Sequence, residues 1–412
     1  MTFTLERKAE APATAVPRAE LFISSAFIGF IALCLAILLV QTLYPVFGKI
    51  VQPLEERRAP NRFPSLRLLL GTNGDFAAGL NKWFEDVAGF RDLFIRTKNQ
   101  IDYTLFHTSR KVYIGSDGWL FPRENGPDAM THLDAAALSS LEESYLTLAR
   151  RLHDKGVKLI VVGYPDKSTI YSEMAPRQMP TRTAGGNYDR FRHFLASRSD
   201  LTFIDAEEIL KREKSNTSEH LYLQQDAHVT EIGQLPVVKE IIRSIALAAG
   251  RPDIRWDEKF KLAHGIVPAG SEGRFMSLLF PTPEEEPYFE GRYSVGGQES
   301  DGQWFLPSPH LLESADDGAG RPFDWEFRSL PELCQERLPG MVLFGNSFSD
   351  KYWTLGLHRY FCFIRRARNP IGRFKAFYDT MPADTKYFIF EYFEPWLTEV
   401  LTDPWFSYKR PR

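Results

Sequence analysis

The stretch DAAALSSLEESYLTLARRLHDKGVKLIVVGY, residues 134–164, decides the fold. Its first part predicts a helix from about Asp134 to Lys155, because apolar side chains recur on one stripe at helical spacing. The stripe consists of Leu138, Leu141, Tyr145, Leu148 and Leu152. Gly156 is placed to end that helix, and the continuous apolar run VKLIVVGY that follows is typical of a strand buried on both faces.

The same alternation of helices and strands continues along the chain. A helix near 187–198 precedes the strand TFID, and a second helix is expected from about Glu231 to Ala248. Three later apolar runs, MVLFG, YFCFI and KYFIFEYF, are separated by helix-like stretches. Buried strands that alternate with amphipathic helices predict an α/β fold with a parallel sheet covered by helices on both faces.

Three segments outside this alternation have different patterns. A helical stretch is expected over about 76–106, and VYIGSDGWLF, residues 112–121, predicts a hairpin that turns at Asp117 and Gly118. Residues from about 250 to 330 are rich in Pro, Gly and acidic side chains. We expect them to form an insertion of irregular and short β structure that provides part of a substrate surface.

The N-terminal region contains an apolar segment from Leu21 to Tyr44 without a charged residue. Roughly twenty helical residues cross a bilayer core, so a transmembrane helix is expected. Because no small-residue cleavage site follows, an uncleaved signal anchor is favoured over a signal peptide. This divides the chain into a tail (1–20), the anchor (21–44), a proline-containing linker (45–75) and one catalytic domain (76–412).

Composition and cysteine content exclude several classes of function. With 43% apolar and 25% charged residues the chain is globular, and its net charge of −3 offers no broad basic field, so nucleic acid is not an expected partner. The cysteines form no CxxC pair, which argues against a zinc ribbon or a redox motif. Cys34 lies in the apolar segment, while Cys334 and Cys362 are either disulfide-bonded or buried as separate thiols.

The segment MVLFGNSFSD, residues 341–350, places Ser347 directly after a predicted strand and before a helix that begins near Ser349. Such a turn exposes a hydroxyl at the carboxyl end of a strand and directs backbone N–H groups at a reacting centre, as an oxyanion hole requires. A serine in this position is also a common helix N-cap, so a nucleophile needs a partner base.

The segment LQQDAHVT, residues 223–230, supplies a base for Ser347. Residues two apart in an extended segment point to the same side, so Asp226 is placed to orient the imidazole of His228. A helix-capping Asp beside a surface His is the alternative. No second cluster of His or carboxylate side chains completes a metal site, and no metal or other cofactor is expected.

Five motifs in this order resemble the alginate O-acetyltransferases of the AlgJ and AlgX type, a family of SGNH hydrolase-like enzymes. They are FRD at 90–92, IGSDGWLF at 114–121, YPDKSTIY at 164–171, DAH at 226–228 and GNSFS at 345–349. The resemblance covers roughly residues 80–350. It implies an SGNH hydrolase-like α/β fold in which Ser347 is acylated, His228 is the base and Asp226 supports it.

Two positions depart from the family pattern. Asn346 stands where the family usually carries Asp or Thr, and Val229 stands where an aromatic residue is common. Asn346 is retained as an oxyanion or substrate candidate because its amide can still hydrogen-bond. By position, Lys167, Tyr352 and Asn369 are further candidates for substrate contacts, and Lys167 is equally explained as a solvated residue at a strand end.

The resemblance also implies a function. It predicts acetylation of hydroxyls on an extracellular polysaccharide, alginate-like or another exopolysaccharide, through an acetyl-serine intermediate. A membrane-bound O-acyltransferase partner would supply acetyl to a single-pass inner-membrane protein whose catalytic domain faces the periplasm. A carbohydrate acetylesterase with the same triad and a non-catalytic polysaccharide-assembly scaffold remain the alternatives.

Overall fold

The computed structural model of the chain describes residues 18–44, 54, 61–70, 75–87, 89–123, 134–180, 182, 184–294, 300–305, 324–368 and 374–397. The chain divides into two compact units, Met1–Ile101 and Asp102–Arg412. Helices of the first unit are α1 (Arg18–Leu43), the 3-10 helix η2 (Leu66–Leu70) and α2 (Asp75–Val87), and α3 (Arg91–Phe106) begins there.

Helix α1 has the properties predicted for the apolar segment. Its Ser25–Leu43 portion has a mean hydropathy of 2.5 and is long and apolar enough to cross a membrane. The single helical stretch expected over 76–106 is wrong in one respect, because it is broken between α2 and α3. Phe90 has a φ of 68°, which a right-handed helix cannot contain.

The second unit is built on a seven-stranded sheet. Its order is β4 (Leu201–Asp205), β3 (Lys158–Tyr164), β11 (Tyr387–Phe393), β9 (Met341–Gly345), β10 (Phe363–Arg368), β8 (Trp325–Ser329) and β7 (Gly302–Phe305). The first five strands are parallel, which confirms the core of the predicted sheet.

The expectation of a wholly parallel sheet needs correction, because β8 and β7 join the edge antiparallel. Both strands come from the region that we expected to form a separate insertion. Alternate residues of β8 are buried, and this one-sided burial is typical of an antiparallel strand. The run expected as a strand at 360–364 also begins later, at Phe363, because Tyr360 ends the 3-10 helix η5 (Leu357–Tyr360).

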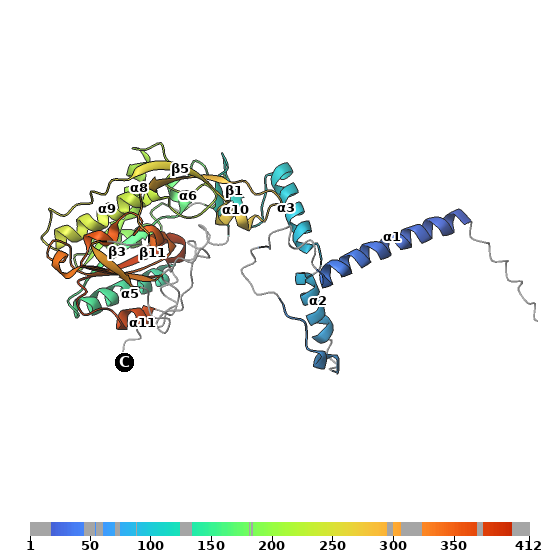
Figure 1. Cartoon of the computed structure of the whole chain (residues 1–412), viewed down its shortest axis with the longest axis horizontal. Helices are drawn as coiled ribbons and strands as arrows, with labels where there is room; N and C mark the ends of the chain where they lie inside the picture. Colours follow the sequence, from blue (N-terminus) through green and yellow to red (C-terminus); the bar gives the residue numbers. More distant parts are fainter. Residues whose placement is uncertain are drawn as a thin grey trace, which may run out of the picture. The chain divides into compact units, whose positions relative to one another are not determined.

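Helices cover both faces of the sheet, as predicted (Figure 1). One face packs against α5 (Ala135–His153), α7 (Asn187–Ala196) and α11 (Phe374–Asp379), and the other packs against α8 (Ala206–Lys214) and α9 (Glu231–Ala248). Of these five helices, α8 is the one that the sequence pattern missed. Successive residues of β3 alternate between the two cores, so Val161 belongs to the first and Val162 to the second.

The smaller elements surround this layered core. They are the hairpins β1 (Val112–Ile114) with β2 (Leu120–Pro122) and β5 (Lys261–Val267) with β6 (Glu284–Glu290), and the short helices α6 (Lys167–Ile170), α10 (Ser271–Phe275), η3 (Pro331–Leu333) and η4 (Ser347–Lys351). The predicted hairpin turn is confirmed, since Asp117 and Gly118 both adopt positive φ.

The carboxyl ends of β3, β11 and β9 lie side by side at one edge of the sheet. Parallel strands bring the residues that follow them together, and this is where ligands bind in open α/β sheets. At the opposite end of these strands, Cys362, directly before β10, forms a disulfide with Cys334, with Cα atoms 4.6 Å apart. Of the two interpretations of these cysteines, pairing is therefore correct.

Candidate active site

Ser347 lies in a tight turn at the end of β9. Strand β9 ends at Gly345, Asn346 caps the following 3-10 helix, and its Oδ1 accepts a hydrogen bond from Phe348 N at 2.8 Å. The helix expected near Ser349 therefore begins two residues earlier, at Ser347 itself. A Cβ at Gly345 would lie 2.6 Å from Ser349 Oγ, so the close approach of the turn requires glycine.

A buried arginine stabilises this turn through hydrogen bonds. Arg366, 1% exposed, comes from β10 and donates through Nη2 to Asn346 O at 2.7 Å and to the carboxylate of Asp350. Glu391 lies in the same buried layer and accepts a hydrogen bond from Tyr352 at 2.8 Å. Burial raises the pKa of Glu391 to about 7.

His228 and Asp226 lie at the tip of a short loop before α9. The loop is closed by an antiparallel bridge between Tyr222 and Val229 and by a hydrogen bond from Leu223 N to His228 O at 3.1 Å. Thr230 then caps α9 by accepting from Gly233 N. These bonds hold the two side chains out toward the end of β9.

The structure brings Ser347, His228 and Asp226 into one hydrogen-bonded chain. His228 Nε2 lies 2.7 Å from Ser347 Oγ, although 119 residues separate them in sequence. The other ring nitrogen, Nδ1, contacts Asp226 Oδ1. When Nδ1 donates to the carboxylate, Nε2 carries the lone pair that accepts the serine proton, and this is the arrangement that activates a serine hydroxyl.

Asp226 is held in place by backbone groups as well. Its Oδ1 accepts from His228 N at 3.1 Å and its Oδ2 accepts from Ser271 N at 2.8 Å. Burial acts to raise the pKa of Asp226, but the charge and hydrogen bond of His228 and the two backbone amides lower it overall. Asp226 is therefore ionised across the physiological pH range.

The electrostatic surroundings of His228 favour its protonated form. Burial acts to lower the pKa of His228, but the adjacent Asp226, followed by the charges of Glu272 and Asp350, raises the pKa above its ordinary value. The ring also lies 5.5 Å from the ring of Phe348, measured between centroids. The residue after the serine thus packs against the base.

The three other described candidates lie as follows. Asn346 lies directly beside Ser347 and is 7% exposed. Lys167 is fully buried, and its ammonium donates to backbone carbonyls of the His228 loop, so neither solvation nor an exposed substrate contact describes it. Tyr352 is also fully buried, with its hydroxyl 2.7 Å from that of Tyr164, which removes it from the substrate side. Asn369 lies outside the described residues.

Sequence reasoning missed the residues that support the His228 loop from the 250–330 region. Gly270 approaches so closely that a Cβ there would lie 2.4 Å from Gln225 O and 2.6 Å from Asp226 Cβ. Ser271 N binds Asp226, and Glu284 accepts from the amides of Gln224 and Gln225. The one signal was the pair of nearby glycines in GSEG, residues 270–273.

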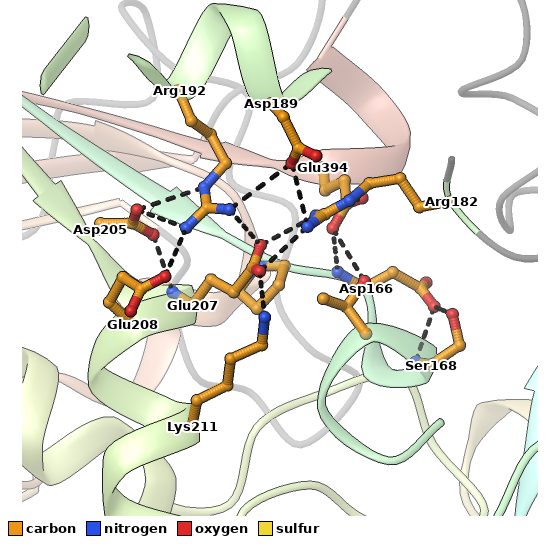
Figure 2. A network of polar contacts seen from close by, with 12 residues as sticks. Asp166, Ser168, Arg182, Asp189, Arg192, Asp205, Glu207, Glu208, Lys211 and Glu394 are labelled. Atoms are coloured by element: carbon orange, nitrogen blue, oxygen red, sulfur yellow. Dashed lines mark hydrogen bonds and ion pairs between the residues drawn. The ribbon is translucent and has the colours of Figure 1, made fainter. Parts of the chain in front are cut away.

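A buried ion network lies at the carboxyl ends of β3, β4 and β11 (Figure 2). Arg182 pairs with Glu207 at 2.8 Å and with Glu394 at 3.2 Å, and Arg192 pairs with Glu207 at 3.0 Å. Glu394 also accepts a hydrogen bond from Asp166 N at 2.8 Å. The network therefore fixes the segment that carries Lys167.

Metal-ion chemistry has no obvious ligand set in the part of the chain that the structure describes. Within those residues, no group of three or more His, Cys, Asp or Glu side chains is arranged to hold a metal ion.

Comparison with known proteins shows which proteins this domain resembles. Residues 112–288 match the family described as SGNH hydrolase-like domain, acetyltransferase AlgX. The probable alginate O-acetylase AlgJ of Pseudomonas aeruginosa is 27% identical over 176 residues, which are 41% of this chain and 42% of that protein. The chain thus matches less than half the length of this curated relative. Both His228 and Asp226 lie within the family match, and Ser347 lies beyond it.

Three solved structures are similar to this chain. The O-acetyltransferase domain of Pseudomonas putida AlgJ aligns with a TM-score of 0.46 at 16% identity and covers 70% of this chain and 92% of its own. Bacillus cereus PatB1 aligns with a TM-score of 0.44 at 13% identity and covers 70% and 97%. Pseudomonas aeruginosa AlgX aligns with a TM-score of 0.40 at 15% identity and covers 70% and 67%.

Proposed function

We propose that this chain is a serine-dependent O-acetyltransferase that acts on an extracellular polysaccharide. The match of residues 112–288 to the SGNH hydrolase-like domain of acetyltransferase AlgX and the similarity to AlgJ support this proposal. The observation that carries this proposal is the hydrogen-bonded chain from Ser347 Oγ through His228 to Asp226. A serine becomes a nucleophile near neutral pH only beside such a base.

In the first half-reaction, Ser347 Oγ attacks the carbonyl carbon of an acetyl donor while His228 Nε2 takes the hydroxyl proton. The tetrahedral intermediate collapses, the bond to the donor oxygen breaks, and His228 returns the proton to that leaving oxygen. The product is acetyl-Ser347. We assign the backbone N–H of Ser347 and the side-chain amide of Asn346 as the groups that donate hydrogen bonds to the developing oxyanion.

In the second half-reaction, a sugar hydroxyl attacks the acetyl-serine carbonyl and passes its proton to His228. Collapse of this second intermediate breaks the bond to Ser347 Oγ, which regains its proton from the imidazolium. Transfer to sugar requires that the bound acceptor exclude or outcompete water. If water attacks instead, the same residues act as an acetylesterase.

The N-terminal helix suits a protein that works at a membrane surface. We assign residues 1–20 to a cytoplasmic tail, 21–44 to a single-pass anchor in the inner membrane, 45–75 to a linker and 76–412 to a periplasmic catalytic domain. The properties of Ser25–Leu43 support the anchor. A membrane-bound O-acyltransferase partner would then deliver acetyl to the periplasmic side.

The experiment that tests the activity uses the full chain in detergent with a chromogenic acetyl ester, with and without polysaccharide fragments as acceptors. Ser347→Ala removes the nucleophile, and Ser139→Ala, at an exposed position on α5, is the matched control. We expect Ser347→Ala to reduce acetyl release by about 10³-fold or more and Ser139→Ala to leave it unchanged.

The outcomes separate the three functions. Acetylated sugar formed at the expense of free acetate supports the transferase, and acetate as sole product with every acceptor supports the esterase. Equal, negligible turnover by wild type and Ser347→Ala would contradict both enzymatic functions and favour a polysaccharide-assembly scaffold.

A further inference from the structure

Lys167 is a buried cation whose hydrogen bonds all converge on the loop that carries the catalytic base. It is 0% exposed and begins helix α6, directly after β3. Its Nζ donates to Leu223 O at 3.2 Å, to Gln224 O at 3.0 Å and to Asp226 O at 2.9 Å. An ammonium has three donors and no acceptor, so these bonds use its whole capacity.

A carboxylate holds the same stretch of backbone by its amides. Glu284, 3% exposed, comes from β6 and accepts from Gln224 N and, at 3.0 Å, from Gln225 N. The one carbonyl that the lysine does not reach is that of Gln225, which accepts from Glu272 N at 3.1 Å and from Gly273 N at 3.2 Å. The loop Leu223–Asp226 is therefore held by a cation at its carbonyls and an anion at its amides.

This arrangement explains how a lysine can be fully buried here. A buried charge is costly unless other charges and hydrogen bonds compensate it. Burial lowers the pKa of Lys167, while the carboxylates of Glu272, Asp226, Glu284 and Asp166 act in the opposite direction. The ammonium also lies 5.2 Å from the ring centroid of Phe121, within cation–π range.

The support of Lys167 is itself fixed. Asp166 caps helix α6 by accepting from Ser168 N at 2.8 Å, and its own backbone N donates to Glu394 at 2.8 Å. Glu394 belongs to the buried network with Arg182, so α6 is tied to the sheet edge (Figure 2). A lysine on so rigid a base can position the loop that it binds.

We propose that Lys167 is a positioning residue that, together with Glu284, fixes the loop Leu223–Asp226 and so holds His228 within hydrogen-bonding distance of Ser347. The kinetic part of this inference rests on the proposed function. Lys167 touches neither the nucleophile nor a solvent-accessible surface, so its removal lowers kcat and leaves KM for a small ester unchanged.

Removal of the cation has a second consequence, which a purely structural role would not produce. A positive charge near Asp226 opposes protonation of the neighbouring His228. When that charge is lost, the imidazolium becomes more stable and the pKa of His228 rises. The acid limb of the pH–rate profile then moves to higher pH.

The test compares Lys167→Met with Lys158→Met in the full chain in detergent. Lys158 lies at the other end of β3 and is exposed, so it is the matched control. For Lys167→Met we expect kcat to fall by about 10²-fold with KM within about twofold, because a misplacement of 1 Å has costs of this order. We also expect faster hydrogen exchange in a peptide that covers residues 223–228. Lys158→Met should match wild type in every measurement.

A folded Lys167→Met protein with wild-type exchange, kcat and acid limb would overturn the inference. If Lys167→Met does not fold, Glu284→Gln takes its place, since it weakens the bonds at the other side of the loop and predicts the same faster exchange. In wild type itself the amides of Gln224 and Gln225 must exchange slowly. Rapid exchange at these amides would refute the proposal that Lys167 and Glu284 fix the loop. Exchange does not depend on turnover, so an inactive wild type would contradict the proposed function alone.

Discussion

At the residue scale, the site depends on which ring nitrogen of His228 carries the proton. Asp226 accepts from Nδ1, which leaves Nε2 free to accept from Ser347 Oγ across 2.7 Å. The Oδ2 atom of Asp226 is occupied by Ser271 N, so the carboxylate cannot rotate away without losing that bond. Asp226 is thus constrained by a partner outside the triad.

The pH dependence of ester turnover follows from the environment of His228. Because Asp226, Glu272 and Asp350 raise the pKa of His228 despite its burial, its neutral form, which is the base, is populated only above that raised pKa. We expect kcat/KM to rise with pH and to level off above the ordinary histidine value of about 6.5. Initial rates across pH with a small acetyl ester measure this.

Replacement of a neighbouring carboxylate tests whether these charges raise the pKa of His228. Asp350→Asn removes one of the anions that raise the pKa of His228, and it should move the acid limb to lower pH. An acid limb below the ordinary histidine pKa in wild type would show that His228 is not the titrating base.

At the element scale, the region near 250–330 contributes more hydrogen bonds and ion pairs to the site than its irregular composition indicates. Strand β6 supplies Glu284 to the His228 loop, and Glu286 to Lys351 of η4 at 3.0 Å, so one strand contacts both halves of the site. Helix α10 supplies Ser271 N to Asp226. The acidic strand is therefore part of the site's framework.

The sequence predicted the helices and strands whose apolar patterns are local, and it placed Ser347, His228 and Asp226 at the ends of such elements. It could not predict the role of Glu284, because EEE at 284–286 is typical of a solvated surface. Only the alternation of a strand buries Glu284 and leaves Glu285 exposed. The edge pairing of β7 and β8 was missed because both strands come from the region whose Pro, Gly and acidic residues indicated an irregular insertion.

Gly270 tests the contact between this region and the His228 loop. A methyl group there would lie 2.4 Å from Gln225 O and 2.6 Å from Asp226 Cβ. Because Gln225 O is a backbone atom, it cannot move aside as a flexible side chain would. We expect Gly270→Ala to lower the free energy of unfolding by about 1–3 kcal/mol and to reduce kcat. Chemical denaturation and ester turnover measure the two effects.

Gly265→Ala in β5 is the matched control for this replacement. Its new methyl group would lie 3.2 Å from Tyr288 Cε1, at a side chain that can shift. A Gly270→Ala protein as stable and active as Gly265→Ala would refute the close packing of the two segments.

At the scale of the whole molecule, the second unit buries three carboxyl groups, one in β11, one directly after it and one in α10. Glu272, Glu391 and Glu394 are each at most 3% exposed, and burial is the main reason that the pKa of each is raised to about 7. In an unfolded chain the same groups titrate at about 4.3. The folded protein therefore binds more protons than the unfolded chain between these values.

The sign of the stability change follows from that difference. Where the folded state binds more protons, the free energy of unfolding falls as pH rises, so stability is lost between about pH 4.3 and pH 7. We expect a lower melting temperature at pH 8 than at pH 5.5. Glu391→Gln, which keeps the size and loses the titration, should reduce the difference, and a protein more stable at pH 8 would contradict this account.

The measurement that tests the central claim most directly is the detection of an acetyl group on Ser347. The full chain is incubated with an acetyl ester, quenched in acid, digested and examined by mass spectrometry, with Ser347→Ala and Ser139→Ala treated in the same way. The proposed mechanism predicts one acetyl group on the peptide that contains Ser347 in wild type and Ser139→Ala, and its loss when excess acceptor is added before the quench. Turnover without any label on that peptide, or turnover that persists in Ser347→Ala, would contradict an acetyl-serine intermediate.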